Sequence, residues 1–356
     1  MNWTKNMLCS ALAITCLSPA ATVAANTQGD VRLKSPWDFE RVNLTGAPYS
    51  CPEPVHLSPD LSTNSFYSDG KHSVIDPERM KTYNATAGPY KELGNVAVAA
   101  TDAYLRTGSR GAVQCLVRHL DQAAGDGVFT GKMNSNQAYY VQGWVIGAIA
   151  ICYLKARDSG LIPIEQRDRI LSWIQQVVRQ TQDYYDGHRA KQSDAENNHL
   201  YWAGVEVAAA GIAANNRNLF NWGVDTYHAG VAQIQSDGTL PREMARGQRA
   251  LHYHLFAASP LVYLAEFGED NGLDLYAENN AALKRLVEVS THGLINNSFF
   301  VERAGVAQDT PNGDPTAEEI GWAKPYVKRF PNPVISGLLA HAPSLSYMYL
   351  GGLPPD

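Results

Sequence analysis

The sequence has little charge and few cysteines: charged residues make up 18% of its 356 residues, and five residues are cysteine. It contains no repeat or low-complexity tract of the kind that fibrous or disordered proteins carry. With 29 basic against 35 acidic residues, the net charge is −6. A protein that coats nucleic acid or binds an anionic membrane needs a basic surface, so both classes are excluded. A local basic site within an acidic molecule is still compatible with this balance.

Several catalytic and metal-binding motifs are also absent. The sequence has no GxSxG, no Walker A motif, no GxGxxG after a strand, no HExxH and no EF-hand loop. His252 and His254 are two residues apart, so they point to different sides of a helix and do not make a metal pair. Glycosidase chemistry needs two facing carboxylates, whereas Glu196 and Glu243 are single. The sequence therefore offers neither a metal site nor a glycosidase pair.

The N-terminus has the pattern of a secretory signal peptide. Lys5 precedes an apolar stretch from Met7 to Leu17, and mostly small residues fill positions 20–25. A membrane anchor or a buried first helix is the alternative, but the apolar run is too short to span a bilayer. We expect residues 1–25 to be removed near Ala25 and the rest of the chain to be secreted without membrane insertion.

Removal of this segment would leave three cysteines in an oxidising compartment. Cys152 lies in an apolar run and is expected to be a buried free thiol. Cys51 and Cys115 flank more polar sequence, so a disulfide, if one forms, should join these two.

The remaining chain, residues 26–356, is expected to be a single domain. Residues 26–90 are rich in proline and polar residues and are expected to be irregular, with 61–76 either a loop over a cleft or a plain connector. From Glu92 onward, helical periodicity alternates with short polar turns. Helices are expected at 92–106, 110–123, 135–157, 163–186, 196–214, 216–236, 248–267, 272–293 and 332–349, with shorter pieces at 74–82 and 316–323. Residues 299–315 interrupt this rhythm. Short connections favour antiparallel hairpins, so the fold is predicted to be all-α, an α/α toroid or barrel.

A first cluster of chemically active residues stands at a helix start, Glu196-Asn197-Asn198-His199-Leu200-Tyr201-Trp202. Asn197 is a plausible N-cap, which places Asn198 and His199 in the first turn. Free backbone N–H groups there favour anionic ligands. A histidine at such a position is more often a hydrogen-bonded structural residue, so this cluster alone is suggestive.

The second cluster runs from Pro241 to His254 and holds three arginines and two histidines against one glutamate. If a helix begins near Gln248, Arg249 and Tyr253 are neighbours on one face. A guanidinium close to a phenol favours the phenolate, so we expect the pKa of Tyr253 to fall below its usual value of about 10. Arginine also binds carboxylates and phosphates well. The alternative is a solvated basic face.

Together the two clusters resemble the mannuronate-specific alginate lyases, periplasmic proteins of alginate-producing bacteria. The matching strings are Asn197–Trp202, Gly238–Pro241 and Ala245–His254, and a looser match runs over residues 137–154. The sequence departs from the family pattern at two places, and both concern the preference of the sugar-binding subsites. Leu200 stands where the family has serine, and Asn136-Gln137 replaces a His-Thr pair of some members.

The resemblance implies an incomplete α/α toroid with a tunnel-like cleft, and β-elimination of poly-β-D-mannuronate without a metal or other cofactor. The product would carry a 4-deoxy unsaturated uronate at its non-reducing end. Asn198 and Arg246 would bind and neutralise the sugar carboxylate. Tyr253 would be the general base, the general acid or both. His199 would share proton transfer, or hold the carboxylate and orient Tyr253.

Further implications concern substrate binding and location. The candidates for sugar subsites are Asn64, Ser65, Tyr67, Asn136, Gln137, Trp202, Arg249 and His254. The resemblance also implies the Cys51–Cys115 disulfide, a periplasmic location, and alginate as the partner, with the alginate secretion machinery as an open second partner. Two other readings stay open: a lyase for another uronate polymer, and a non-catalytic alginate-binding protein.

Overall fold

The computed structural model describes Met1 and residues 32–39, 42–188, 196–309 and 313–356. The predicted signal peptide, residues 1–25, lies outside this range apart from Met1. Arg32–Asp356 forms one compact unit. In its described residues the regular structure is helical, and β-pairing is limited to isolated bridges.

Three helices are buried on nearly every side: α3 (Asn136–Ala156), α5 (Asn198–Ala213) and α8 (Ala250–Asp270). They are apolar around most of their circumference, as expected for helices without a solvent face. α1 (Pro77–Thr107) packs against α3, α3 against α5, and α5 against α8. These four helices form the inner layer.

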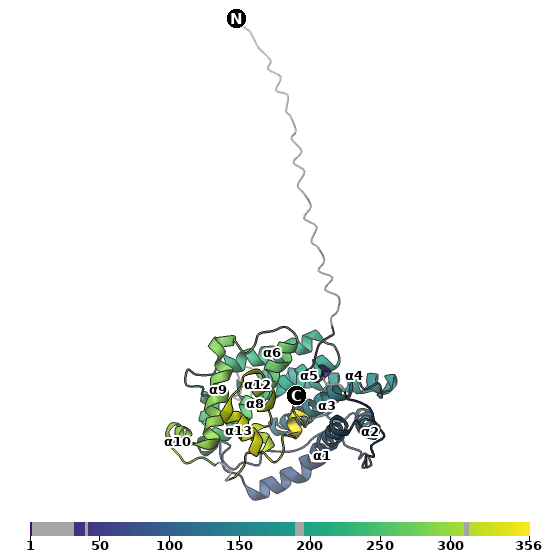
Figure 1. Ribbon diagram of the computed structural model, residues 1–356, viewed down its shortest axis with the longest axis horizontal. Coiled ribbons are helices and arrows are strands. Elements are labelled where there is room, and N and C mark those ends of the chain that lie inside the picture. The colour runs from purple at the N-terminus through teal and green to yellow at the C-terminus, as the bar shows by residue number, and fades with distance from the viewer. Residues whose placement is uncertain (2–31, 40–41, 189–195, 310–312) are drawn as a thin grey trace. The chain divides into compact units, whose positions relative to one another are not determined.

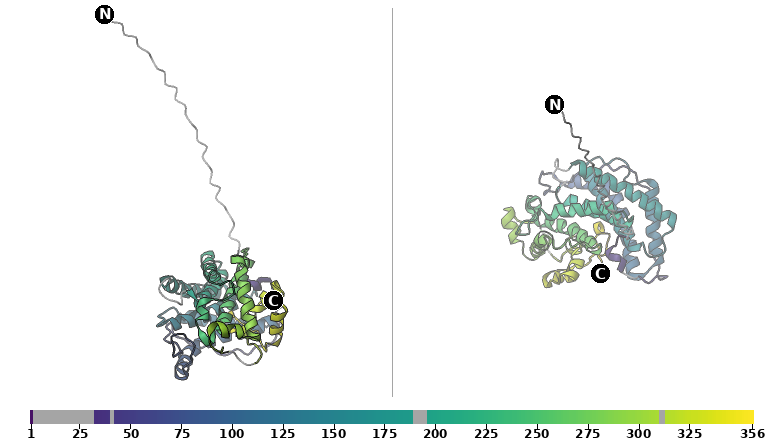
Figure 2. Two further views of the ribbon diagram at one scale, coloured as in Figure 1. Left: turned by 90° about the vertical axis from the view of Figure 1, so that its left-hand side faces the viewer. Right: turned by 90° about the horizontal axis from the view of Figure 1, so that it is seen from above.

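The outer layer consists of α2 (Arg110–Asp126), α4 (Ile164–His188), α6 (Arg217–Val231) and α9 (Glu278–Ile295). Each follows an inner helix in the chain and packs against it, giving the hairpins α1–α2, α3–α4, α5–α6 and α8–α9. Figure 1 shows α2, α4, α6 and α9 at the periphery. From above, the earlier and later helices lie on opposite sides (Figure 2). The prediction of an incomplete α/α toroid of antiparallel hairpins is confirmed.

Glycines allow the tightest of these helix contacts. A Cβ atom on Gly204 of α5 would lie 1.9 Å from Thr226 Oγ1 of α6, and one on Gly223 of α6 would lie 2.6 Å from the Cβ of Ala208. A side chain at either position would therefore force α5 and α6 apart.

The shorter elements connect and close the layers. They are η1 (Pro36–Phe39), α7 (Pro241–Met244), η3 (Gly247–Arg249), α10 (Ser298–Ala304), α11 (Ala317–Ile320), α12 (Ala323–Arg329), α13 (Pro333–His341) and η4 (Met348–Leu350).

The boundary between the irregular N-terminal segment and the first helix was predicted wrongly. Helix α1 begins at Pro77, with Asp76 as its N-cap, so the irregular segment ends there rather than at residue 90. Pro89 lies inside the helix, where proline normally removes a hydrogen bond. Tyr83 and Tyr90 on either side are buried, and this packing holds the helix together across the proline.

The C-terminal prediction also needs correction. The expected helix 332–349 ends at His341, because Ala342 precedes a proline and is extended, with φ −66° and ψ 125°. The chain then runs on to η4, with Met348–Leu350. Residues 299–315 were expected to interrupt the helical pattern, but part of this segment is helical, since α10 covers Ser298–Ala304.

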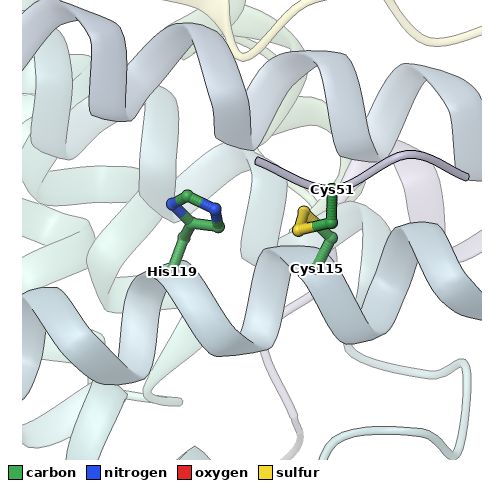
Figure 3. Close-up of side chains that lie close together, drawn as sticks. All are labelled: Cys51, Cys115 and His119. Atoms are coloured by element: carbon green, nitrogen blue, oxygen red, sulfur yellow. A yellow bond between two sulfur atoms is a disulfide. The ribbon is translucent and has the colours of Figure 1, made fainter. Parts of the chain in front are cut away.

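The disulfide prediction is confirmed. Cys51 and Cys115 are bonded, with their Cα atoms 5.6 Å apart, and Cys152 is a buried free thiol. The bond ties the extended N-terminal segment to α2, and His119 lies one turn further along that helix (Figure 3). His119 Nε2 is 3.0 Å from the carbonyl oxygen of Pro52. The two cysteines and His119 are close enough to resemble a metal site, but both sulfurs are engaged in the disulfide.

Over the described part of the chain, none of the helices combines the length and the apolar character needed to cross a bilayer.

Candidate active site

A cavity of about 1300 Å³ opens where the N-terminal ends of α3, α5 and α8 meet. Helix N-termini carry partial positive charge and unpaired N–H groups. The lining adds five cationic side chains against one carboxylate, Glu318. The cations are Lys71, Lys91, Arg242, Arg246 and Arg249. A protein of net negative charge thus concentrates positive charge in this cavity.

The segment from α7 to the start of α8 supplies the central groups. The guanidinium of Arg246 lies over the ring of Tyr253, 4.2 Å from its centroid, and that of Arg249 is 5.6 Å away. Both contacts have cation–π geometry. The predicted association of Tyr253 with these arginines is therefore confirmed.

The hydroxyl of Tyr253 is nearly enclosed. It donates a hydrogen bond to Tyr67 Oη at 3.0 Å, and the side chain is 6% exposed. Burial raises the pKa of Tyr253 far above its usual range, and Tyr67 adds to this rise, whereas Arg246 and Arg249 lower it. The predicted fall in the pKa of Tyr253 is wrong while its hydroxyl is enclosed in this way, because the effect of burial outweighs that of the two arginines.

Asn198 and Arg246 meet at a buried carboxylate. Glu243, 1% exposed, accepts hydrogen bonds from the backbone N–H of Asn198 at 2.9 Å and from its side-chain amide at 3.0 Å. Arg246 Nε lies 3.8 Å from the same carboxylate. Burial raises the pKa of Glu243 against the lowering effect of Arg246. Glu243 therefore fixes two residues that the sequence had predicted to be catalytic.

His199 lies in the first turn of α5, after its N-cap Asn197, whose side chain accepts from the His199 N–H at 3.0 Å. Its ring stacks on Tyr140 of α3, with centroids 3.6 Å apart. Burial, together with the charge of Arg246, lowers the pKa of His199 well below its usual range. The imidazole is therefore neutral near pH 7, with one ring nitrogen as a hydrogen-bond donor and the other as an acceptor.

The loop 61–76 reaches across to the start of α8. Besides the Tyr67 contact, the carbonyl of Lys71 accepts from Arg246 Nη1 at 3.3 Å, and the carbonyl of Ser73 accepts from Gln248 Nε2 at 2.9 Å. Asn64, Ser65 and Tyr67 all line the cavity. The loop thus forms one wall of the cavity next to Tyr253.

The other predicted substrate-binding residues divide into two groups. Asn136, Gln137 and Arg249 line the cavity. Trp202 is 3% exposed and its indole N–H donates to the carbonyl of Phe256, while His254 is fully buried between Leu240 N and the Ala250 carbonyl. Neither reaches the cavity lining, so a direct contact of Trp202 or His254 with substrate is not supported.

Asn198, predicted to be catalytic, is likewise fully buried and lies behind the cavity wall. Its amide oxygen has no hydrogen-bond partner. The neighbouring Asn197 lines the cavity instead.

Sequence reasoning missed several lining residues from distant segments. Tyr83 and Lys91 come from α1, and Tyr347 and Tyr349 come from the C-terminal tail. Lys91 Nζ lies 5.6 Å from the ring centroid of Tyr83 and 5.7 Å from that of Tyr349. These residues carry no local motif, and only the packing of the tail against α1 and α3 brings them together.

The arrangement suits one kind of chemistry. Cations and helix N-termini can bind an anionic chain, and a phenol beside two guanidinium groups and a neutral imidazole can move a proton. Aromatic rings along the walls offer surfaces for sugar rings.

Comparison with known proteins agrees with this picture. The family model described as "Alginate lyase" matches residues 60–300. The chain is 36% identical to a polysaccharide lyase of Stenotrophomonas maltophilia over 286 residues, covering 80% of this chain and 83% of the relative. It is 32% identical to an alginate lyase of Azotobacter vinelandii over 298 residues, covering 82% and 78%.

Solved structures share the fold. Alginate lyase A1-III from Sphingomonas species A1 aligns with a TM-score of 0.71 at 22% identity, over 90% of this chain and 89% of that one. A variant of that enzyme complexed with a tetrasaccharide aligns with a TM-score of 0.73, also at 22% identity, over 90% and 88%. The family model and the sequence relatives each span more than two thirds of the chain, and the chain belongs to the alginate lyase family of polysaccharide lyases.

Proposed function

We propose that this protein cleaves the 1,4-glycosidic bonds of poly(β-D-mannuronate) in alginate by β-elimination, leaving a 4-deoxy unsaturated uronate at the new non-reducing end. The observation that carries the proposal is the position of Tyr253. Its hydroxyl lies at the wall of a cationic cavity, with Arg246 4.2 Å above its ring.

The difficulty of the reaction lies in the C5 proton, which is only weakly acidic. Its removal puts negative charge on the sugar carboxylate, and groups that neutralise this charge lower the barrier. Arg246 lines the cavity and is held by Glu243. We assign carboxylate neutralisation to Arg246, with Asn198 acting through the same buried Glu243 rather than by direct contact.

Tyr253 is the proposed proton-transfer group. In mannuronate the C5 proton and the C4 leaving oxygen are on the same face of the ring, so one phenol can serve both. The phenolate of Tyr253 takes the C5 proton, the electrons of the C5–H bond form the C4=C5 double bond, and the C4–O bond breaks with its electrons on the leaving oxygen. The Tyr253 phenol formed in this way gives its proton to that oxygen, which regenerates the phenolate. Arg246 and Arg249 act against burial and lower the pKa of Tyr253, and release of its hydrogen bond to Tyr67 on substrate binding would lower this pKa further. His199 binds the carboxylate beside it.

A polymer panel tests the proposal. The protein is incubated separately with polymannuronate, polyguluronate and hyaluronan, and the ultraviolet absorbance of the unsaturated product is followed. We expect the fastest rise with polymannuronate. Faster cleavage of another polymer would assign the protein to a different uronate, and binding without product from any of them would favour an alginate-binding protein.

We also propose that residues 1–25 are a signal peptide and that the mature protein is periplasmic. The pattern of Lys5, the apolar run and the small residues before Ala25 supports this. N-terminal sequencing of protein from a periplasmic fraction should begin near residue 26. An intact Met1 in that fraction would contradict cleavage. Association with the alginate secretion machinery is a further proposal, testable by co-purification from an alginate-secreting host.

A further inference from the structure

A carboxylate with no role in the proposed reaction lies behind His199. Glu206 is on α5, seven residues after His199, and is fully buried. Residues seven apart on a helix lie on the same stripe, and helical side chains lean toward the N-terminus. Glu206 therefore leans toward the imidazole from within the protein.

Besides Gln142 Oε1, two polar atoms in this region have no hydrogen-bond partner. They are Nδ1 of His199 and Oε2 of Glu206, both buried. A buried polar atom without a partner is costly, and an ordered water often satisfies such atoms.

A small cavity separates the two residues, with room for about one water molecule. His199, Ala203 and Glu206 form one side of it, and Tyr140 and Gly143 of α3 form the opposite side. A Cβ atom on Gly143 would lie 3.1 Å from Glu206 Oε2. The missing side chain of Gly143 thus leaves space where that oxygen points.

The other oxygen of Glu206 has a fixed role. Gln142 Nε2 donates to Thr181 Oγ1 at 2.8 Å, and the Thr181 hydroxyl donates to Glu206 Oε1 at 3.0 Å. Oε1 already accepts a hydrogen bond from the Thr181 hydroxyl. The proton of neutral Glu206 is therefore on Oε2, the oxygen that faces the cavity.

We propose that Glu206 is a positioning residue for His199: through one water in this cavity, it decides which ring nitrogen of the imidazole carries the proton. Neutral Glu206 donates to the water, and the water donates to Nδ1, so the proton stays on Nε2. Ionised Glu206 accepts from the water, which accepts from Nδ1–H, and Nε2 then presents a lone pair. The change between these states releases one proton from the Glu206–water–His199 unit.

The surroundings of Glu206 place the loss of its proton within a pH range in which the protein can be studied. Burial raises the pKa of Glu206 to about 8, partly offset by Thr181. The other titratable groups lining the small cavity are Tyr139 and Tyr140 from α3 and Tyr185 from α4, and the charges acting on His199 from the substrate side are those of Arg246 and His72.

The consequence for catalysis rests on the proposed function. With Glu206 neutral, His199 offers an Nε2–H donor to the sugar carboxylate. As pH rises through the pKa of Glu206, this donor is lost. Turnover of the wild type should therefore decline on the alkaline side, and Glu206→Gln should remove that decline, because glutamine keeps the donor at every pH.

The direct test needs no catalysis. Long-range proton–nitrogen NMR spectra of protein containing nitrogen-labelled histidine report the tautomer of each imidazole, and a His199→Gln spectrum assigns the signal. In the wild type, His199 should carry its proton on Nε2 below the pKa of Glu206 and on Nδ1 above it. In Glu206→Gln, the proton should stay on Nε2 throughout.

Two further variants complete the design. Gly143→Ala fills the cavity while keeping Glu206, and should also abolish the pH-dependent change. Glu266→Gln alters a carboxylate bound to Tyr276 and Arg329, and should leave the His199 signal as in the wild type. A wild-type tautomer that is constant with pH, or a change that persists in Glu206→Gln, would overturn the inference. Failure of the polymer panel alone would overturn only the substrate assignment.

Discussion

The two walls around Tyr253 are built differently. The helical wall, from α7 to the start of α8, is buried and held by side chains: Glu243 is 1% and Arg246 is 9% exposed. The opposite wall, loop 61–76, exposes Lys71 and His72, and His72 has a left-handed φ of 52°. The loop contacts the helical wall mainly through backbone carbonyls and the Tyr67 hydroxyl.

The difference separates two tasks. A polymer must enter and leave the cavity, and a wall held by few hydrogen bonds can open at small cost. Charge stabilisation needs groups that do not reorganise during the reaction, and the network of Glu243, Asn198 and Arg246 provides this. We therefore expect substitutions in the helical wall to reduce the rate of chemistry, and those in the loop to change its pH dependence or substrate affinity.

Tyr253→Phe should give the largest effect. It removes the proton-transfer hydroxyl but keeps the ring under Arg246, so kcat should fall by about 10²–10⁴-fold, the usual contribution of general acid–base catalysis. Product absorbance with polymannuronate measures this. Tyr227→Phe is the matched control, because its hydroxyl is buried on Leu275 outside the cavity, and its kcat should stay near the wild type. Equal rates in both variants would remove Tyr253 from the mechanism.

Glu243→Gln tests whether the buried carboxylate of Glu243 holds Asn198 and Arg246 in place in the helical wall. The amide would present a donor to Asn198 Nδ2 and lose the charge that holds Arg246. We expect kcat to fall by about 10–100-fold, since removing one charge-stabilising group commonly costs about 3 kcal/mol, and this variant only displaces it. KM should change little. A loss confined to KM would show that Arg246 binds substrate without stabilising the transition state.

Tyr67→Phe tests the loop. The hydrogen bond from Tyr253 to Tyr67 favours the protonated phenol, so its loss should lower the pKa of Tyr253. If the phenolate is the base, kcat/KM of the free enzyme rises with pH on the acidic side of the profile, below the decline that Glu206 is proposed to cause, and this rise should move to lower pH. One hydrogen bond of about 1 kcal/mol corresponds to less than one pH unit. A move to higher pH would contradict the assigned donor and acceptor.

Much of this helical wall was predictable because its signals are local. The first turn of α5 has an N-cap at Asn197, and the segment 241–254 concentrates arginine and histidine, so both clusters were visible in the sequence. The helix positions followed from periodicity for α2 to α5. The start of α1 was missed because the proline-rich residues 26–90 were expected to be irregular, although Pro77 stands at the first helical position and tertiary packing holds the helix together across Pro89.

What the sequence could not show depends on contacts between distant segments. The pKa of Tyr253 is set by enclosure under Tyr67, which lies 186 residues earlier in the chain. His254 and Trp202 occur in the matching strings, but helix rotation turns both into the core. Tyr347 and Tyr349 join the cavity only because Pro343 ends α13 and lets the tail return over α3.

Removal of the disulfide should have the smallest effect on catalysis, and it tests whether the loop wall depends on this distant link. Cys51 and Cys115 close a loop with a sequence separation of 64, and such a link commonly contributes about 2–4 kcal/mol to the free energy of unfolding. The link anchors the segment before loop 61–76 at α2, away from Arg246 and Tyr253. The double variant Cys51→Ser, Cys115→Ser should therefore melt at lower temperature, while kcat at a temperature where it is folded stays within about twofold of the wild type. Cys152→Ser is the control for general loss of a cysteine. A large fall in kcat of the folded double variant would mean that the loop depends on this anchor to keep its wall in place, and that the two walls are less independent than their contacts indicate.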